Sequence, residues 1–167
     1  MVKLTEYPTL VDWMEVKRRA LITVGKRPVR PPDETWEVAI LTAAHSPIRY
    51  LRFSFDLLGI PSYVATHLAR HVHAQPYIRT QRTDRTGVDR HELPQDEPVD
   101  MIYDVNAEEL LTIARKRLCN QADQATRAVV REMCCQVEEQ CPEFRGLLQP
   151  LCEWLGRCPE MKPCGKH

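Results

Sequence analysis

Arginine and histidine side chains gather in one short segment of the chain, and their types point to a particular chemistry. Between positions 67 and 91 there are five arginines, four of the six histidines and no lysine. The arginines are Arg70, Arg79, Arg82, Arg85 and Arg90, and the histidines are His67, His71, His73 and His91. Arginine presents a planar fork of donors that suits phosphate and carboxylate, whereas lysine offers a compact point charge. The segment therefore favours the binding of an anionic ligand.

Two other interpretations of this segment stay open. Arginine-rich segments also occur as solvated faces or as partners of nearby acids, and Asp84, Asp89 and Glu92 are available here. His67 and His71 are four residues apart, so on a helix they would share a face and could bind a metal ion. No glutamate stands between them as in the HExxH motif, so we expect no metal there.

The spacing of the polar residues matches a known signature. Arg70-His71-Val72 is followed by seven residues, then by Thr80 and, two positions on, by Arg82. This order resembles the flavin-dependent thymidylate synthases, in which a helix ends in RHR, seven residues follow, and a serine and an arginine come next. Other elements resemble the family from residue 43 to residue 127. They are His45-Ser46-Pro47 and Phe53-Ser54-Phe55 upstream, and Arg90, Leu93-Pro94, Asn106-Ala107 (family NAR) and Arg117-Leu118-Cys119 (family LRL) downstream.

The resemblance implies a reaction and a set of partners. Family members convert dUMP to dTMP, with methylenetetrahydrofolate as carbon donor, FAD as hydride carrier and NADPH as reductant. They are homotetramers in which several subunits build each active site. By resemblance, the dUMP-binding residues are His67, Arg70, Thr80, Arg82, Arg90 and Arg117, the FAD-binding residues are Ser46, Arg70, His71 and Asn106, and the catalytic residues are Arg117 and Thr80. An arginine near the pyrimidine would also stabilise negative charge that develops on the ring.

The departures from the family pattern lie mostly on the flavin side. Val72 replaces the second arginine of RHR, Tyr77 replaces an asparagine, and Ile78 and Arg49 replace glutamates. Thr80 keeps the hydroxyl of the family's serine. Three hypotheses follow: a divergent flavin-dependent thymidylate synthase, a relative that binds or modifies a pyrimidine nucleotide without FAD, and a non-catalytic nucleotide-binding protein stabilised by zinc.

Length and composition limit the classes of protein to which this chain can belong. The chain has 167 residues, 43% of them hydrophobic and 28% charged, which suits one globular domain over residues 1–167. Its net charge is zero, which argues against a nucleic acid polymer as partner. No apolar run is long enough to span a membrane and no signal-peptide core is evident, so we expect a cytoplasmic protein.

Seven cysteines are many for this length. In a reducing compartment a disulfide framework is not expected. Cys152, Cys158 and Cys164 recur every six residues in the tail, at about 150–167, and with Cys141 they are weak candidates for a structural zinc. Buried or incidental thiols are the alternative, because the CxxC pairs of common zinc modules are absent.

Hydrophobic periodicity predicts an α+β fold, an antiparallel sheet packed against long helices. Expected helices cover 9–20, a segment after Asp33, a long segment from Asn106 to Cys141 broken near Asn120, and 143–149. Alternation predicts strands at 51–57 and 99–105, joined through a long loop at 75–98. Asn106 is the expected helix cap, with Glu109 closing a capping box.

Overall fold

The computed structural model describes residues 1–166, so His167, the last residue of the expected tail, lies outside the described residues. The strands are β1 (Val2–Glu6), β2 (Arg52–Pro61), β3 (Gln75–Ile78) and β4 (Pro98–Asn106). The helices are α1 (Leu10–Ile22), α2 (Glu34–Thr42), α3 (Ser62–Ala69), α4 (Thr83–Thr86), α5 (Ala107–Arg117), α6 (Gln124–Gln140) and α7 (Leu151–Leu155). Two 3-10 turns are η1 (Ser46–Tyr50) and η2 (Pro142–Phe144).

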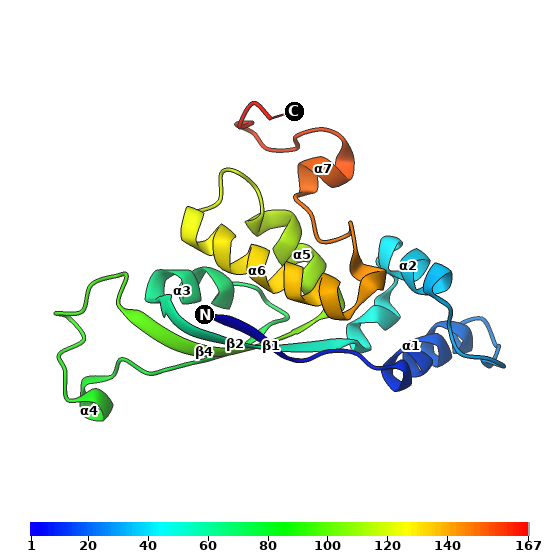
Figure 1. Ribbon diagram of the computed structural model, residues 1–167, viewed down its shortest axis with the longest axis horizontal. Coiled ribbons are helices and arrows are strands. Elements are labelled where there is room, and N and C mark those ends of the chain that lie inside the picture. The colour runs from blue at the N-terminus through cyan, green and yellow to red at the C-terminus, as the bar shows by residue number, and fades with distance from the viewer. Residues whose placement is uncertain (167) are drawn as a thin grey trace.

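The strands form one antiparallel sheet in the order β1-β2-β4-β3, and α3, α5 and α6 cover one of its faces (Figure 1). The expected α+β architecture is therefore confirmed. In the central pair, Phe55 lies opposite Tyr103 and Leu57 opposite Met101, and all four side chains are buried. Their alternation with polar residues turns the apolar face toward the helices, as the period of a strand requires.

Helix boundaries follow the predicted signals. The Asp33 side chain accepts a hydrogen bond from Trp36 N and caps α2, and Asn106 accepts one from Glu109 N and caps α5. The long C-terminal helix is broken as expected, because α5 ends at Arg117 and α6 begins at Gln124. No helix among residues 1–166 is long and apolar enough to cross a membrane.

Two sequence predictions are wrong. The expected loop at 75–98 begins with strand β3, an edge strand that tolerates Pro76 because one of its sides carries no ladder. The expected helix at 143–149 is a 3-10 turn that ends before Gly146, whose φ of 73° does not fit a right-handed helix. Phe144, Leu147 and Leu148 are buried there, and this spacing imitates a helical stripe.

Strand β1 was not predicted, because it is short and only Val2 and Leu4 are partly buried. Its backbone is held by Gln136 of α6, which accepts a hydrogen bond from Leu4 N at 2.7 Å and donates one to Val2 O at 2.9 Å. A polar side chain on a distant helix thus completes the pairing of this edge strand, a relationship that periodicity does not encode.

Candidate functional site

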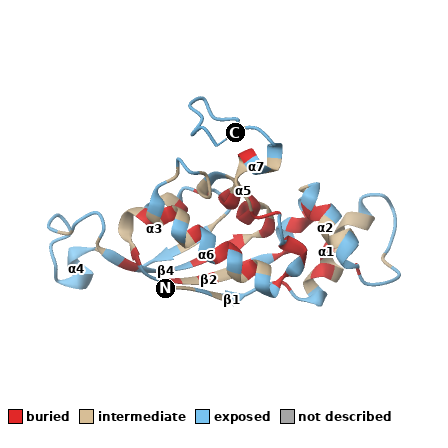
Figure 2. Ribbon diagram, turned by 45° about the horizontal axis from the view of Figure 1, so that its top comes forward, coloured by how far each residue is buried: buried red, intermediate tan, exposed pale blue. Residues whose placement is uncertain are grey.

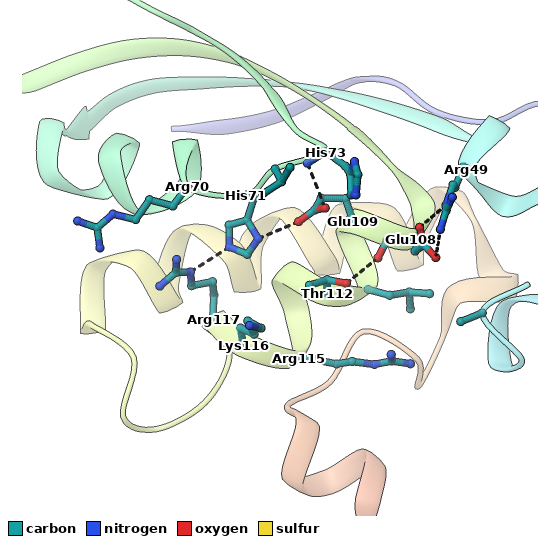
Figure 3. A pocket seen from close by; sticks show the side chains of 13 residues that line it. Arg49, Arg70, His71, His73, Glu108, Glu109, Thr112, Arg115, Lys116 and Arg117 are labelled. Carbon is teal, nitrogen blue, oxygen red and sulfur yellow. Dashed lines mark hydrogen bonds and ion pairs between the residues drawn. The ribbon is translucent and has the colours of Figure 1, made fainter. Parts of the chain in front are cut away.

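A cavity of about 590 Å³ opens beside α5, between η1 and the segment that follows α3 (Figure 3). Its volume is in the range of small-molecule sites. The charged and imidazole side chains that line it are Arg49, Arg70, His71, His73, Glu108, Glu109, Arg115, Lys116 and Arg117. Five cationic side chains therefore face two carboxylates, and the cavity favours an anionic ligand.

His71 lies at the centre of a buried hydrogen-bond chain. Its Nδ1 is 2.9 Å from Glu109 Oε1, and Arg117 donates Nε–H to His71 Nε2 over 3.1 Å (Figure 3). Because the guanidinium can only donate, Nε2 must accept, and the single imidazole proton is on Nδ1, directed at Glu109. The three residues thus fix one tautomer of His71.

The electrostatic surroundings agree with a neutral imidazole. Burial lowers the pKa of His71, and the Arg117 charge also lowers it, while the hydrogen bond that His71 donates to Glu109 opposes these effects. A neutral His71 with Nε2 already engaged is not a free proton donor toward the cavity. We therefore assign it the role of holding Arg117 in place.

Glu109 is the functional residue that sequence reasoning placed wrongly. Its backbone N–H is capped by Asn106, but its carboxylate does not close a capping box. Instead Oε1 pairs with His71 and Oε2 accepts a hydrogen bond from His73 N at 3.3 Å. With about 6% of its surface exposed, Glu109 is buried, and that burial could not be read from its spacing as a capping-box residue.

Arg117 is held at two points. Besides His71, its Nη2 donates to His67 O at 2.9 Å, so one guanidinium connects α5 to α3. It lies in the last turn of α5 beside Arg115 and Lys116, where the helix dipole favours cations. Neither Arg115 nor Lys116 was predicted as a site residue, although three consecutive basic residues at a helix end were a usable signal.

Arg49 and Glu108 form an ion pair at the opposite wall, with Arg49 Nη2 3.2 Å from Glu108 Oε1 (Figure 3). Arg49 stands where the resembling family has glutamate. Glu108 directly follows Asn106-Ala107, at the position of the arginine in the family's NAR element. These two positions are therefore in contact in this chain, and each carries the opposite sign of charge to the residue of the resembling family.

Six of the predicted residues do not line this cavity, and three of those six lie on one projecting segment. Thr80, Arg82 and Arg90 belong to a projecting segment of residues 79–98, called the arm here, which carries α4 away from the helices (Figure 1). Thr80 lines a second cavity of about 400 Å³ at the base of the arm. Arg82 pairs with Asp84 at 2.8 Å, and both side chains are more than half exposed. Within one chain, some of the predicted site residues therefore line the main cavity and others lie on the arm.

The remaining predicted residues surround the cavity or cap its helices. His67 and Arg70 line a third cavity of about 340 Å³ along α3, and Arg70 also lines the main one. Ser46 is exposed at the start of η1, and the side-chain oxygen of Asn106 caps α5. Among residues 1–166, no group of three or more His, Cys, Asp or Glu side chains is already arranged to hold a metal ion.

Comparison with known proteins assigns this architecture. A family model described as "Thymidylate synthase complementing protein" matches residues 88–143. Two crystal structures of thymidylate synthase X from Helicobacter pylori, both with FAD and dUMP, superpose with a TM-score of 0.68 at 12% identity. In each case the match covers 89% of this chain and 99% of the other. The chain has the fold of the flavin-dependent thymidylate synthases. No curated protein sequence matches it.

The resemblance seen in the sequence is thereby confirmed in the fold, and a model of the resembling family matches part of the chain. The family match begins within the arm and runs through β4, α5 and α6, so it includes Glu109, Arg117 and the predicted Arg90. Arg70, His71 and Thr80 lie outside the matched range, and their assignment depends on the signature and on the geometry of the cavity.

Proposed function

We propose that this protein is a flavin-dependent thymidylate synthase that methylates dUMP to dTMP, with methylenetetrahydrofolate as carbon donor and NADPH as reductant. The observation that carries the proposal is the Arg117 guanidinium, fixed by His71 and by His67 O at the wall of a cation-rich cavity. A donor fork with a fixed orientation is suited to a phosphate or to a pyrimidine carbonyl that gains negative charge during reaction.

The nucleotide would be bound mainly by arginines. Arg70 reaches both the main cavity and the third cavity along α3, so it can contact a ligand that extends from one to the other. Arg117 would face the pyrimidine and Arg70 its phosphate or the adjoining flavin. Both side chains remain charged at any physiological pH, so they neutralise the anion without a proton transfer.

The residues around the cavity fit FAD in charge and in surface. Arg70, Arg115 and Lys116 supply cations for its diphosphate, and Val72, 86% exposed, offers an apolar surface for a ring. Bound FAD would supply the hydride. His71, neutral and held by Glu109, would keep its ring orientation constant throughout, because both ring nitrogens are already engaged.

The division of predicted residues supports a shared site. Thr80, Arg82 and Arg90 lie on the arm, while Arg70, His71 and Arg117 line the main cavity. We infer that the arm of one subunit completes the cavity of another in a homotetramer, and that the enzyme acts in the cytoplasm. The exposed Arg82–Asp84 pair contributes little stability, so Arg82 can exchange Asp84 for a nucleotide phosphate.

A second function is favoured by one observation. At Val72 this chain lacks a cation that the resembling family carries on the flavin side, whereas the arginines assigned to the nucleotide are retained. A relative that binds or modifies a pyrimidine nucleotide without FAD would have this composition.

The absorbance spectrum of the purified protein, before and after incubation with FAD and dUMP, separates the two. We expect flavin bands that survive gel filtration, bleach on addition of NADPH, and support formation of dTMP when methylenetetrahydrofolate is added. Retention of dUMP without flavin would overturn the first proposal in favour of the second. Binding of neither ligand would overturn both.

A further inference from the structure

The C-terminal tail, residues 150–166, is attached to the rest of the molecule through α7, where Cys152 is buried and Trp154 packs partly buried against the core. Within α7 only Cys152 is buried, and residues 156–166 form no helix or strand and are mostly exposed (Figure 2). A segment of this length cannot offset its conformational entropy with so small an apolar contact. Small cysteine-rich segments are commonly held by metal ions or disulfides instead.

Four thiols surround one small space under this tail. Cys119, at the end of α5, and Cys152, Cys158 and Cys164 of the tail all line a cavity of about 10 Å³. That volume admits about one water molecule and excludes a nucleotide or a flavin. All four cysteines are free of disulfides. The space is suited to a single ion.

Cys141, the fourth ligand considered from sequence, lies elsewhere. It follows α6 in the core and does not line this cavity, and burial raises the pKa of its thiol to about 12. Cys119 takes its place, although it is 33 residues from Cys152 in the sequence. Only the folded chain brings them together, which is why spacing alone did not include it.

Arg115 supplies a second, independent observation. Its Nε–H is buried with no hydrogen-bond partner, its guanidinium lies 4.9 Å from the Trp154 ring centre, and it lines the same cavity. Burial without an acceptor lowers its pKa. A buried N–H without an acceptor on a partly buried cation is costly, and an anionic thiolate centre beside it would offset that cost.

We propose that Cys119, Cys152, Cys158 and Cys164 bind one Zn²⁺ ion as a tetrahedral four-thiolate site. Binding releases the four thiol protons to solvent and leaves a centre of net charge −2 beside Arg115. In residues 1–166 the sulfurs do not already converge as ligands do, so the tail must close around the ion. The exposed, irregular residues 156–166 can move without disturbing a helix or strand. Because Arg115 also lines the main cavity, the ion would fix one wall of that site.

The full chain should be purified from medium supplemented with zinc, dialysed, and analysed for metal by mass spectrometry. A four-thiolate site predicts about one zinc per chain, and Co²⁺ in its place should give the absorption bands of a tetrahedral thiolate complex. Cys119→Ser, Cys158→Ser and Cys164→Ser should each reduce retained zinc at least about tenfold. Cys135→Ser, on the exposed side of α6, is the matched control and should retain it.

Far-UV circular dichroism of each variant distinguishes loss of a ligand from loss of the fold. The proposal would be overturned if the wild-type protein retained no zinc. It would also be overturned if the four cysteines of the proposed site formed two disulfides and no longer reacted as free thiols. Full zinc retention by Cys119→Ser would also overturn it, because a site built by the tail alone would not use Cys119. The readout is metal content, so it is independent of flavin or nucleotide binding.

Discussion

Arg117 and His71 are joined by a 3.1 Å hydrogen bond in which the guanidinium donates and the imidazole accepts. The bond requires a neutral His71, because a charged imidazole would present a second donor to Arg117. The lowered pKa of His71 therefore makes the orientation of Arg117 depend on pH: it is maintained above the ordinary pKa of histidine and lost as pH falls through the lowered value. The proposed function therefore assigns the contact with the nucleotide to a positioned Arg117 and gives His71 the role of positioning it.

The first prediction concerns the arginines assigned to dUMP. Arg117→Ala and Arg82→Ala should each weaken dUMP binding more than tenfold, because a hydrogen bond to a charged group contributes about 1.5–3 kcal/mol. Isothermal titration calorimetry measures the affinity. Arg30→Ala, an exposed site outside the resembling segments, is the control and should bind dUMP normally. Unchanged affinity in both test variants would contradict the nucleotide assignment.

The second prediction concerns Glu109, whose two carboxylate oxygens accept from His71 and from His73 N. Glu109→Gln replaces one carboxylate oxygen with an amide N–H₂. In either orientation of the amide, this N–H₂ faces a donor, which is His71 Nδ1–H in one case and His73 N–H in the other. We expect a loss of about 1–3 kcal/mol in the free energy of unfolding, measured by urea denaturation. Glu108→Gln, in the exposed ion pair with Arg49, should cost less than about 1 kcal/mol. Equal losses in the two variants would mean that the buried hydrogen bonds of Glu109 contribute no more to stability than the ion pair of Glu108 does.

Sequence reasoning succeeded where local chemistry determines the result. Alternation at Phe53 and Phe55 gave the central strand, and the polar side chains of Asp33 and Asn106 gave two helix starts. The signature at Arg70-His71 pointed to the resemblance, and the resemblance predicted the fold that the structure has. Each of these signals lies within a few residues of what it specifies.

Sequence reasoning failed where a residue is defined by a distant partner. Glu109 has the spacing of a capping-box residue, yet it serves His71, 38 positions earlier in the chain. Cys119 resembled an isolated thiol, and the pairing of Arg49 with Glu108 could not be read from two separate departures. Long-range contacts of this kind are established only when the helices pack on the sheet.

The third prediction tests the shared site. Arg117→Ala and Thr80→Val should each lower turnover, and mixing the two variants after dissociation should restore activity. Random reassembly leaves both residues intact at about a quarter of two-chain sites. Mixing Arg117→Ala with Arg70→Ala should restore nothing, because both residues line the same cavity of one chain. If the first mixture restores no activity in assembled tetramers, a site that takes Arg117 from one subunit and Thr80 from another is contradicted.

The fourth prediction concerns the reversed ion pair of Arg49 and Glu108. Either single change, Arg49→Glu or Glu108→Arg, sets like charges together and should lower the free energy of unfolding by less than about 1 kcal/mol, because Arg49 is largely exposed. The double variant should recover that loss and, by restoring the family's order of charges, should bind FAD more tightly. Fluorescence titration with FAD measures the second effect. Tighter binding by Arg49→Glu alone would contradict a role for the pair.

The fifth prediction concerns Glu37 on α2. Burial, with the nearby Glu143 charge, raises the pKa of this carboxyl from 4.5 to about 7. A raised pKa means that the folded protein prefers the protonated carboxyl, so this stabilisation is complete below pH 4.5 and is lost as pH rises through about 7. Glu37→Gln should therefore match the wild type near pH 5 and exceed it near pH 8 by roughly 1 kcal/mol, reduced from the full shift by solvent screening. Urea denaturation at the two pH values measures the difference.

Glu34→Gln, exposed one turn earlier, should show no such pH dependence, and an equal response of the two variants would exclude burial of Glu37 as the cause.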